Sequence, residues 1–157
     1  MTSSDCDYRE RLVSRTPVTV RRRVQWGECD PARVVYTPRF ADYAASAYDW
    51  FSNVVLDGAG FQPERDLVLA PAKHLSLTFH RPLVANEWFE MVVRVDAIRR
   101  HSYDLAIEGT GDDRTPRFSA QVSPIFVSAT SFDKTVIPES VRHRLEDYHA
   151  RFGCDRP

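Results

Sequence analysis

Residues 27–51 read GECDPARVVYTPRFADYAASAYDWF, an irregular loop followed by a strongly amphipathic segment. Asp30 precedes a proline, which disfavours helical backbone angles, so the first part is expected to be a loop. Thr37 can serve as a helix N-cap, and Pro38 suits the first helical position. Apolar residues then recur at helical spacing, at Phe40, Tyr43, Ala44, Ala47, Tyr48 and Phe51. The stretch therefore predicts a long helix that ends by Asp57–Gly58.

Alternating apolar and polar residues predict strands on both sides of this helix. The predicted strands cover about residues 17–26, 67–80, 88–98, 102–108 and 118–127, with Pro71 inside the second and Pro124 inside the last. A charged amphipathic helix is expected at 138–152, and residues 1–16 are interpreted as an N-terminal arm. This order predicts an α+β fold, in which a curved antiparallel sheet of about five strands packs on one central helix.

The composition favours a single domain that covers residues 1–157, with a formal net charge of −1. A near-neutral chain has no overall attraction for nucleic acid or an anionic membrane, and no apolar run is long enough to span a bilayer. The polar N-terminus lacks the apolar core of a secretory signal. The three cysteines, Cys6, Cys29 and Cys154, are far apart and odd in number, which favours a reducing cytoplasm over a disulfide framework.

Residues 27–38, with their Cys-Asp-Pro-Ala block before a helix, resemble the signature of the 4-hydroxybenzoyl-CoA thioesterase family of hotdog proteins. The stretch Phe79-His80-Arg81-Pro82-Leu83 is similar to the family's Tyr/Phe-x-Arg-Pro-Leu, and residues 126–127 and 137–139 match its last strand and the proline after it. The resemblance covers roughly residues 17–145. It implies the hotdog fold, a curved sheet wrapped around a long central helix, and hydrolysis of an acyl-CoA thioester.

The resemblance also implies roles for individual residues. Asp30 matches the catalytic carboxylate, as nucleophile or general base, and the backbone N–H of Thr37 matches the donor that polarises the thioester carbonyl. Arg99, Arg100 and Ser102 match a segment that contacts the CoA phosphates, for which the planar arginine fork is well suited. The family is usually tetrameric, built from dimers whose active sites lie at the subunit interface, and it implies no metal and no redox cofactor.

The sequence departs from the family pattern at two positions. Arg33 replaces the usual glycine, which places a long cation near Asp30 and reduces the freedom of the loop to adopt a positive φ. Ala45 stands where the hydroxybenzoyl enzymes carry a carboxylate on the long helix, so that specificity is not transferred. Arg33 and Tyr36 are the remaining candidates for substrate contact.

Two rival functions stay open at this point. The same fold can act on an acyl carrier protein thioester, which has less need for the two arginines of the phosphate segment. The second rival is a non-catalytic acyl-CoA binding protein, which would result if Arg33 makes the loop inactive.

Cys29 has no adjacent base and is interpreted as a small packed residue rather than a nucleophile. His74 and His80 would lie about 20 Å apart on an extended strand, too far for one metal ion.

Overall fold

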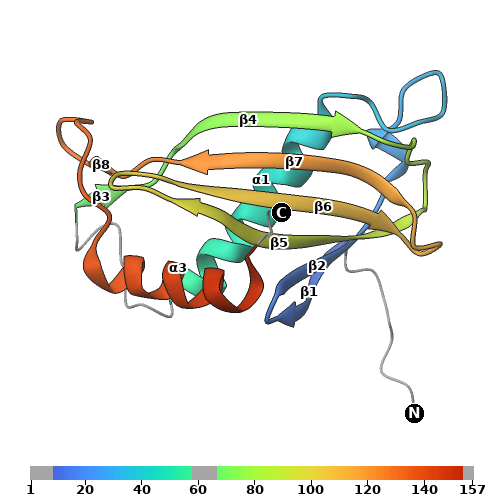
Figure 1. Ribbon diagram of the computed structural model, residues 1–157. Helices are drawn as coiled ribbons and strands as arrows, with labels where there is room; N and C mark the ends of the chain where they lie inside the picture. The colour runs from blue at the N-terminus through green and yellow to red at the C-terminus, as the bar shows by residue number, and fades with distance from the viewer. Residues whose placement is uncertain (1–8, 58–66, 154–157) are drawn as a thin grey trace, which may run out of the picture.

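The computed structural model describes residues 9–57 and 67–153, and its main element is a six-stranded antiparallel sheet of order β1-β2-β5-β6-β7-β4 (Figure 1). The strands are β1 Glu10–Arg15, β2 Val18–Arg23, β4 Ala72–Phe79, β5 Trp88–Ile98, β6 Tyr103–Gly111 and β7 Pro116–Pro124. Two short strands, β3 Val68–Leu69 and β8 Val127–Ser128, pair with each other apart from this sheet. The predicted α+β class is confirmed.

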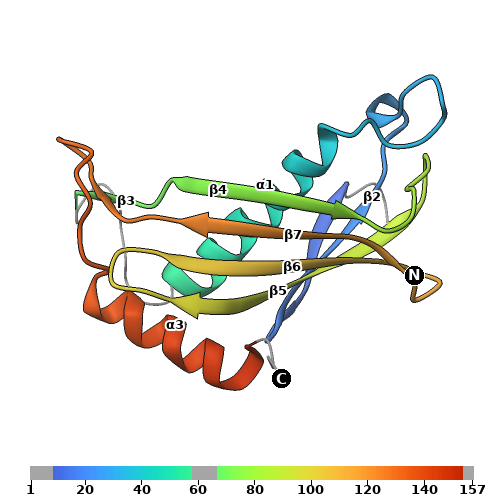
Figure 2. The same ribbon diagram turned by 45° about the horizontal axis from the view of Figure 1, so that its top comes forward.

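Helix α1, Arg39–Phe51, crosses one face of the sheet and continues as a π-helical segment, Ser52–Leu56 (Figure 2). The buried side chains of α1 follow the predicted spacing, since Phe40, Tyr43, Ala44, Ala47 and Phe51 all face the sheet. Pro38 occupies the N-cap position without a side-chain cap bond, so the expected capping by the Thr37 hydroxyl is wrong. The predicted end of the helix at Gly58 lies outside the described residues.

Aromatic packing holds the start of α1 against the sheet. The ring of Phe118 on β7 lies 5.2 Å from that of Phe40 and 6.1 Å from that of Phe89. Gly109 on β6 makes room for it, because a Cβ there would lie 2.2 Å from the Phe118 ring. These rings place the first turn of α1, and the loop before it, at a defined point over the sheet.

A second helix, α3 Glu139–Phe152, packs beside the other end of α1 along β5 (Figure 1). The Tyr148 hydroxyl accepts a hydrogen bond from the Val18 N–H and donates one to the Val93 carbonyl, each 2.7 Å long. Its ring stacks edge-on against Phe51 at 5.2 Å. The predicted C-terminal helix is therefore confirmed, and it closes the core at the end of α1.

The sheet has one more strand than expected. Residues 10–15, predicted to belong to the N-terminal arm, pair with β2 as the edge strand β1. At the opposite edge, β4 is exposed on both faces, and Phe79 on its apolar face is 49% exposed. Edge strands of this kind offer unpaired backbone groups to another chain. No helix among the described residues has the length and apolar character to cross a membrane.

Candidate active site

The loop between β2 and α1 is folded around Asp30. The Asp30 N–H donates a hydrogen bond to the Val34 carbonyl, and the Asp30 carbonyl accepts one from the Arg33 N–H. Each of these bonds is 2.9 Å long. One carboxylate oxygen, Oδ1, accepts a hydrogen bond of 2.8 Å from the Ala32 N–H. The other oxygen has no hydrogen-bond partner within residues 9–57 and 67–153. The turn therefore holds the carboxylate in place and leaves one of its oxygens available.

Arg33 adopts a positive φ, although a residue with a Cβ is expected to limit this conformation. Its φ is 67°, in the left-handed region that glycine adopts freely and other residues disfavour. The expectation that arginine limits this conformation is therefore not met, because the two hydrogen bonds around Asp30 hold the turn in shape. Arginine in place of glycine therefore strains the backbone of the turn, but the hydrogen bonds of the turn are kept.

Asp30 opens into a cavity of about 870 Å³. The cavity is lined by Trp26, Cys29, Asp30, Pro31, Arg33, Val84 and Ala85. The first five residues belong to the loop before α1, and the last two to the connection between β4 and β5. Trp26 is 82% exposed and presents its indole to this space. The cavity combines a carboxylate, a cation and an apolar surface, as binding sites for small molecules commonly do.

Thr37 lies beside this cavity but lines a separate hollow of about 280 Å³, between the start of α1 and residues 79–83. Its N–H donates no hydrogen bond to any described residue, as expected for a donor at a helix start. Tyr36 is exposed, and its N–H is bound to the Glu28 carbonyl at 2.9 Å. The structure thus brings Asp30 and Arg33 into one cavity, whereas Thr37 lines a separate hollow and Tyr36 lines neither of the two.

Cys29 also lines the cavity, but its environment does not favour a thiolate. Burial raises the pKa of the Cys29 thiol, and the charges of Glu28 and Asp30 raise it further, against the opposing effect of the Ala85 N–H. A thiol needs its pKa lowered to act as a nucleophile at neutral pH. Of the two nucleophilic side chains in the cavity, the carboxylate is therefore the better placed.

A buried ionic network supports the loop from beneath. The Glu28 carboxylate accepts hydrogen bonds from Arg22 at 2.7 Å, the Gln25 N–H at 2.8 Å and the Tyr43 hydroxyl at 2.9 Å. Arg22 also pairs with Glu10 of β1 at 2.7 Å and lies over the Tyr43 ring. Burial tends to raise the pKa of Glu28, but these three donors outweigh it and the pKa is lowered. Glu28 therefore ties the loop to β2 and α1 as a carboxylate.

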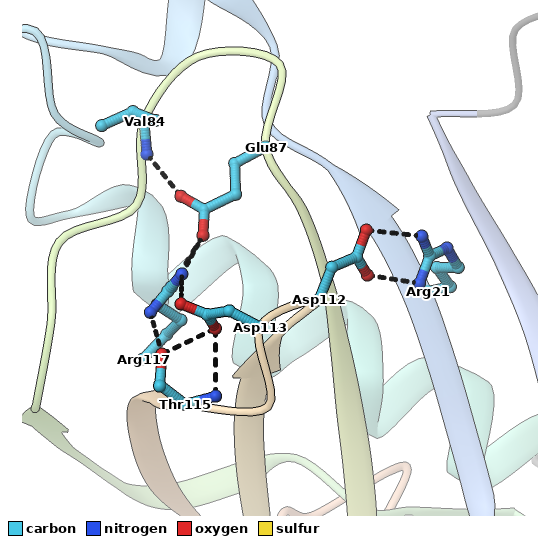
Figure 3. A network of polar contacts seen from close by, with 7 residues as sticks. All are labelled: Arg21, Val84, Glu87, Asp112, Asp113, Thr115 and Arg117. Carbon is cyan, nitrogen blue, oxygen red and sulfur yellow. Dashed lines mark hydrogen bonds and ion pairs between the residues drawn. The ribbon is translucent and has the colours of Figure 1, made fainter.

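A second network supports the other wall of the cavity (Figure 3). Glu87 accepts the Val84 N–H at 3.1 Å and pairs with the guanidinium of Arg117, whose Nε lies 2.7 Å from the carboxylate. Arg117 also contacts Asp113 at 3.1 Å, and its carbonyl accepts the N–H groups of His80 and Arg81. Arg117 thus fastens the connection between β4 and β5 to the hairpin between β6 and β7.

The sequence offered only one sign of these networks. Arg22 interrupts the apolar side of its strand, and a charge at such a position needs a partner. The partners of Arg22 lie on other elements, so the sequence around Arg22 does not identify them. The roles of Glu28, Glu87 and Arg117 have no signal of this kind in the sequence.

The predicted phosphate-binding residues lie elsewhere in the same chain. Arg99, Arg100 and Ser102 occupy the turn between β5 and β6, at the opposite end of the sheet from the Asp30 loop (Figures 1 and 2). Arg99 holds Asp104 with two hydrogen bonds of 2.8 and 2.7 Å, and Ser102 is buried. The Arg100 side chain is exposed and makes no hydrogen bond or ion pair with another described residue. One chain therefore does not bring these residues to Asp30.

Among the described residues, no group of three or more histidine, cysteine or carboxylate side chains could hold a metal ion. His74 and His80 are both exposed on or next to β4, and His80 lies 3.0 Å from the Ser119 hydroxyl. Ala45 is exposed on α1, and the nearby Asp42 pairs with Arg39.

Comparison with known proteins identifies the family and the fold. The model of the thioesterase-like superfamily matches residues 24–145. A 1,4-dihydroxy-2-naphthoyl-CoA thioesterase from Synechocystis is 18% identical, with 88% of this chain and 98% of that chain covered and a TM-score of 0.70. A gentisyl-coenzyme A thioesterase is 19% identical, with 81% and 98% covered and a TM-score of 0.68. A Staphylococcus aureus protein solved in complex with CoA is 13% identical, with 88% and 87% covered and a TM-score of 0.80. No curated protein matches the chain.

At these identities the solved structures show the fold, while the family model covers most of the chain. Fold and family together define a hotdog-fold thioester hydrolase. The chain belongs to the thioesterase-like superfamily.

Proposed function

We propose that this protein hydrolyses an acyl-CoA thioester to the free acid and CoA, with Asp30 as the catalytic carboxylate. The observation that carries the proposal is the position of Asp30, whose carboxylate opens into the large cavity with one oxygen unengaged by the described residues. Relatives of the fold named as acyl-CoA thioesterases, and one solved with CoA, support CoA as the carrier.

Two routes lead to the same products. Asp30 can attack the thioester carbonyl carbon, so that the C–S bond breaks, CoA leaves as its thiol after taking a proton, and water hydrolyses the acyl-aspartyl anhydride. Alternatively, Asp30 accepts a proton from water while the water oxygen attacks the same carbon and the sulfur leaves protonated. In both, the free N–H of Thr37 stabilises the negative charge that develops on the carbonyl oxygen.

We further propose that a second copy of the chain supplies the residues that bind the CoA phosphates at this site. The edge strand β4 is exposed, and Phe79 and His80 at its end line the same hollow as Thr37. Two copies paired antiparallel through β4 are related by a twofold axis, which brings the β5–β6 turn of one copy to the Asp30 end of the other. The side chain of Arg100, which makes no hydrogen bond or ion pair with a described residue, is then available for the CoA phosphates of the neighbouring site.

The test removes the carboxylate of Asp30, once at nearly unchanged side-chain size and once by truncation. Asp30→Asn and Asp30→Ala are expected to reduce kcat/KM for thioester hydrolysis at least about 100-fold, since general acid–base catalysis contributes on the order of 10²–10⁴-fold. Release of free thiol from aromatic, short-chain and long-chain acyl-CoA esters measures the rate. Asp133→Asn, an exposed aspartate outside the cavity, is the matched control and should keep the wild-type rate. Normal turnover by both Asp30 variants would contradict the proposal.

A further inference from the structure

Arg33 places an unpaired cation in the cavity of Asp30. Its side chain is exposed, lines the cavity, and makes no hydrogen bond or ion pair with any described residue. The two buried arginines that support the cavity differ in this respect, since Arg22 and Arg117 are each paired with two carboxylates. The charge of Arg33 is therefore available to a molecule that enters the cavity.

The backbone of Arg33 shows that this cation occupies a position that glycine would fill at lower free energy. A φ of 67° is disfavoured for a residue with a Cβ, and the Arg33 N–H is bound to the carbonyl of Asp30. The strained residue is thus part of the turn that holds the carboxylate. Strain of this kind is enriched at binding and catalytic sites. Because Arg114 has the same conformation outside the cavity, the strain of Arg33 points to a role only together with its position in the cavity.

We infer that the acyl group of the substrate carries an anionic oxygen substituent, such as a carboxylate, that pairs with Arg33; this inference rests on the proposed thioester hydrolysis at Asp30. An acidic acyl group placed beside Asp30 is repelled by its carboxylate unless a cation offsets that charge. The guanidinium does so with two parallel donors that match a carboxylate. The apolar surfaces of Trp26 and Val84 in the same cavity contact the uncharged part of the acyl group.

The acyl group is a better match for Arg33 than the phosphates of CoA. In an acyl-CoA the whole pantetheine arm separates the phosphates from the sulfur, whereas the acyl substituent lies on the other side of the carbonyl carbon. Arg33 lies in the same tight turn as Asp30, and both line one cavity, so with the thioester carbon at Asp30 the Arg33 side chain can reach atoms close to that carbon. Arg33 is therefore a residue that determines acyl specificity.

Binding to Asp30→Asn protein tests the inference without turnover. Glutaryl-CoA and pentanoyl-CoA have acyl chains of equal length and differ in one terminal carboxylate. We expect calorimetry to give a Kd at least about tenfold lower for glutaryl-CoA, which corresponds to about 1.4 kcal/mol. Adding Arg33→Asn should abolish this preference, and adding Arg33→Lys should retain part of it. Asparagine tolerates the left-handed conformation, so Arg33→Asn is expected to fold with an unchanged or higher Tm.

A matched control and a second pair of ligands distinguish binding of the acyl carboxylate from binding of the CoA phosphates. Arg114 has the same unusual conformation, with a φ of 63°, but lies outside the cavity, so Arg114→Asn should keep the preference. The N-acetylcysteamine thioesters of the same two acids lack phosphate and should show the same dependence on Arg33. An equal loss of affinity for both CoA esters, with none for the N-acetylcysteamine esters, would assign Arg33 to phosphate and overturn the inference. So would unchanged binding of all four ligands.

Failure of the proposed function is distinguishable from failure of this inference. If the protein with native Asp30 hydrolyses no thioester, but its Asp30→Asn form still prefers glutaryl-CoA through Arg33, the proposed hydrolysis is contradicted. The inference that the ligand carries an acidic acyl group then still holds. If the protein hydrolyses thioesters, but Arg33→Asn leaves its preference for glutaryl-CoA over pentanoyl-CoA unchanged, the inference about Arg33 is contradicted and the proposed hydrolysis still holds.

Discussion

Glu28 lies two positions before Asp30 and holds the loop at both ends. Its carboxylate binds Arg22 of β2 and Tyr43 of α1, while its carbonyl accepts the N–H of Tyr36 just before the helix. Both charges are buried, so each depends on the other for the polar contacts it loses on leaving water. Glu28 is therefore a positioning residue for Asp30, and the position of the carboxylate depends on a buried ion pair.

Glu28→Gln removes one partner of this pair and is expected to lower the free energy of unfolding by roughly 3 kcal/mol, or Tm by about 6–12 °C for a chain of this size. Because the pKa of Glu28 is lowered from its ordinary 4.5, its contribution is present above that pH and is lost as the pH falls through the folded-state pKa. Thermal unfolding at neutral and acidic pH should show the gap between wild type and variant closing in acid. Glu108→Gln, an exposed control, should behave as wild type. A gap that does not change with pH would contradict this role.

Among the elements, the hairpin between β6 and β7 supports the connection between β4 and β5. Arg117 pairs with Glu87, whose carboxylate binds the N–H of Val84 in the cavity wall (Figure 3). Asp113 in the hairpin accepts hydrogen bonds from the hydroxyl and N–H of Thr115 and from Arg117, and these lower the pKa of Asp113 to about 2. The hairpin therefore supports a cavity wall whose own residues are distant from it in the sequence.

Asp113→Asn tests the hairpin through its pH dependence. The Asp113 pKa falls from 3.8 to about 2, so the stabilisation is complete above about pH 4 and is lost as the pH falls towards 2. The variant should unfold at a lower Tm than wild type at neutral pH, by less than Glu28→Gln because exposed pairs contribute less. Calorimetric scans from pH 7 to pH 2 should show the difference disappearing at the acidic end. A difference that grows in acid would contradict the assignment.

At the scale of the whole molecule, the exposed edge β4 is the surface on which a second copy is proposed to pair. All residues of the strand except Leu77 are exposed, whereas β1 at the other edge alternates between exposed and half-buried residues. Pairing through β4 joins two sheets into one and places the Arg99–Ser102 turn of one copy near the cavity of the other. In this proposal, hydrolysis of CoA esters depends on the dimer.

Ser76→Lys with Thr78→Lys adds like charges to both copies at this edge, which disfavours strand pairing. The double variant is expected to be a folded monomer with at least a tenfold higher KM for acyl-CoA, about 1.4 kcal/mol of lost binding free energy. Sedimentation velocity measures the oligomeric state, and circular dichroism measures the fold. Val13→Lys adds a charge at the exposed part of β1 and should leave the dimer intact. A dimer that persists in the double variant, or dissociates in the control, would contradict pairing through β4.

The local pattern of the sequence determined much of this protein. The predicted strand 88–98 coincides with β5, and the apolar spacing from Phe40 to Phe51 gives the buried face of α1. Both follow from periodicity, which depends only on near neighbours in the chain. The block around Asp30 likewise predicted an irregular loop before the helix, because the backbone preference imposed by proline acts locally.

The tertiary structure alone decided the rest. Residues 10–15 become β1 only because β2 and the buried Arg22 give them partners, and the partners of Arg22 come from three separate elements. The cavity of Asp30 needs the connection between β4 and β5, which reaches it through long-range hydrogen bonds such as Val35 N–H to Leu83 carbonyl at 2.8 Å. Contacts between distant residues leave no periodic signal in one sequence, so these features were decided only when the chain folded.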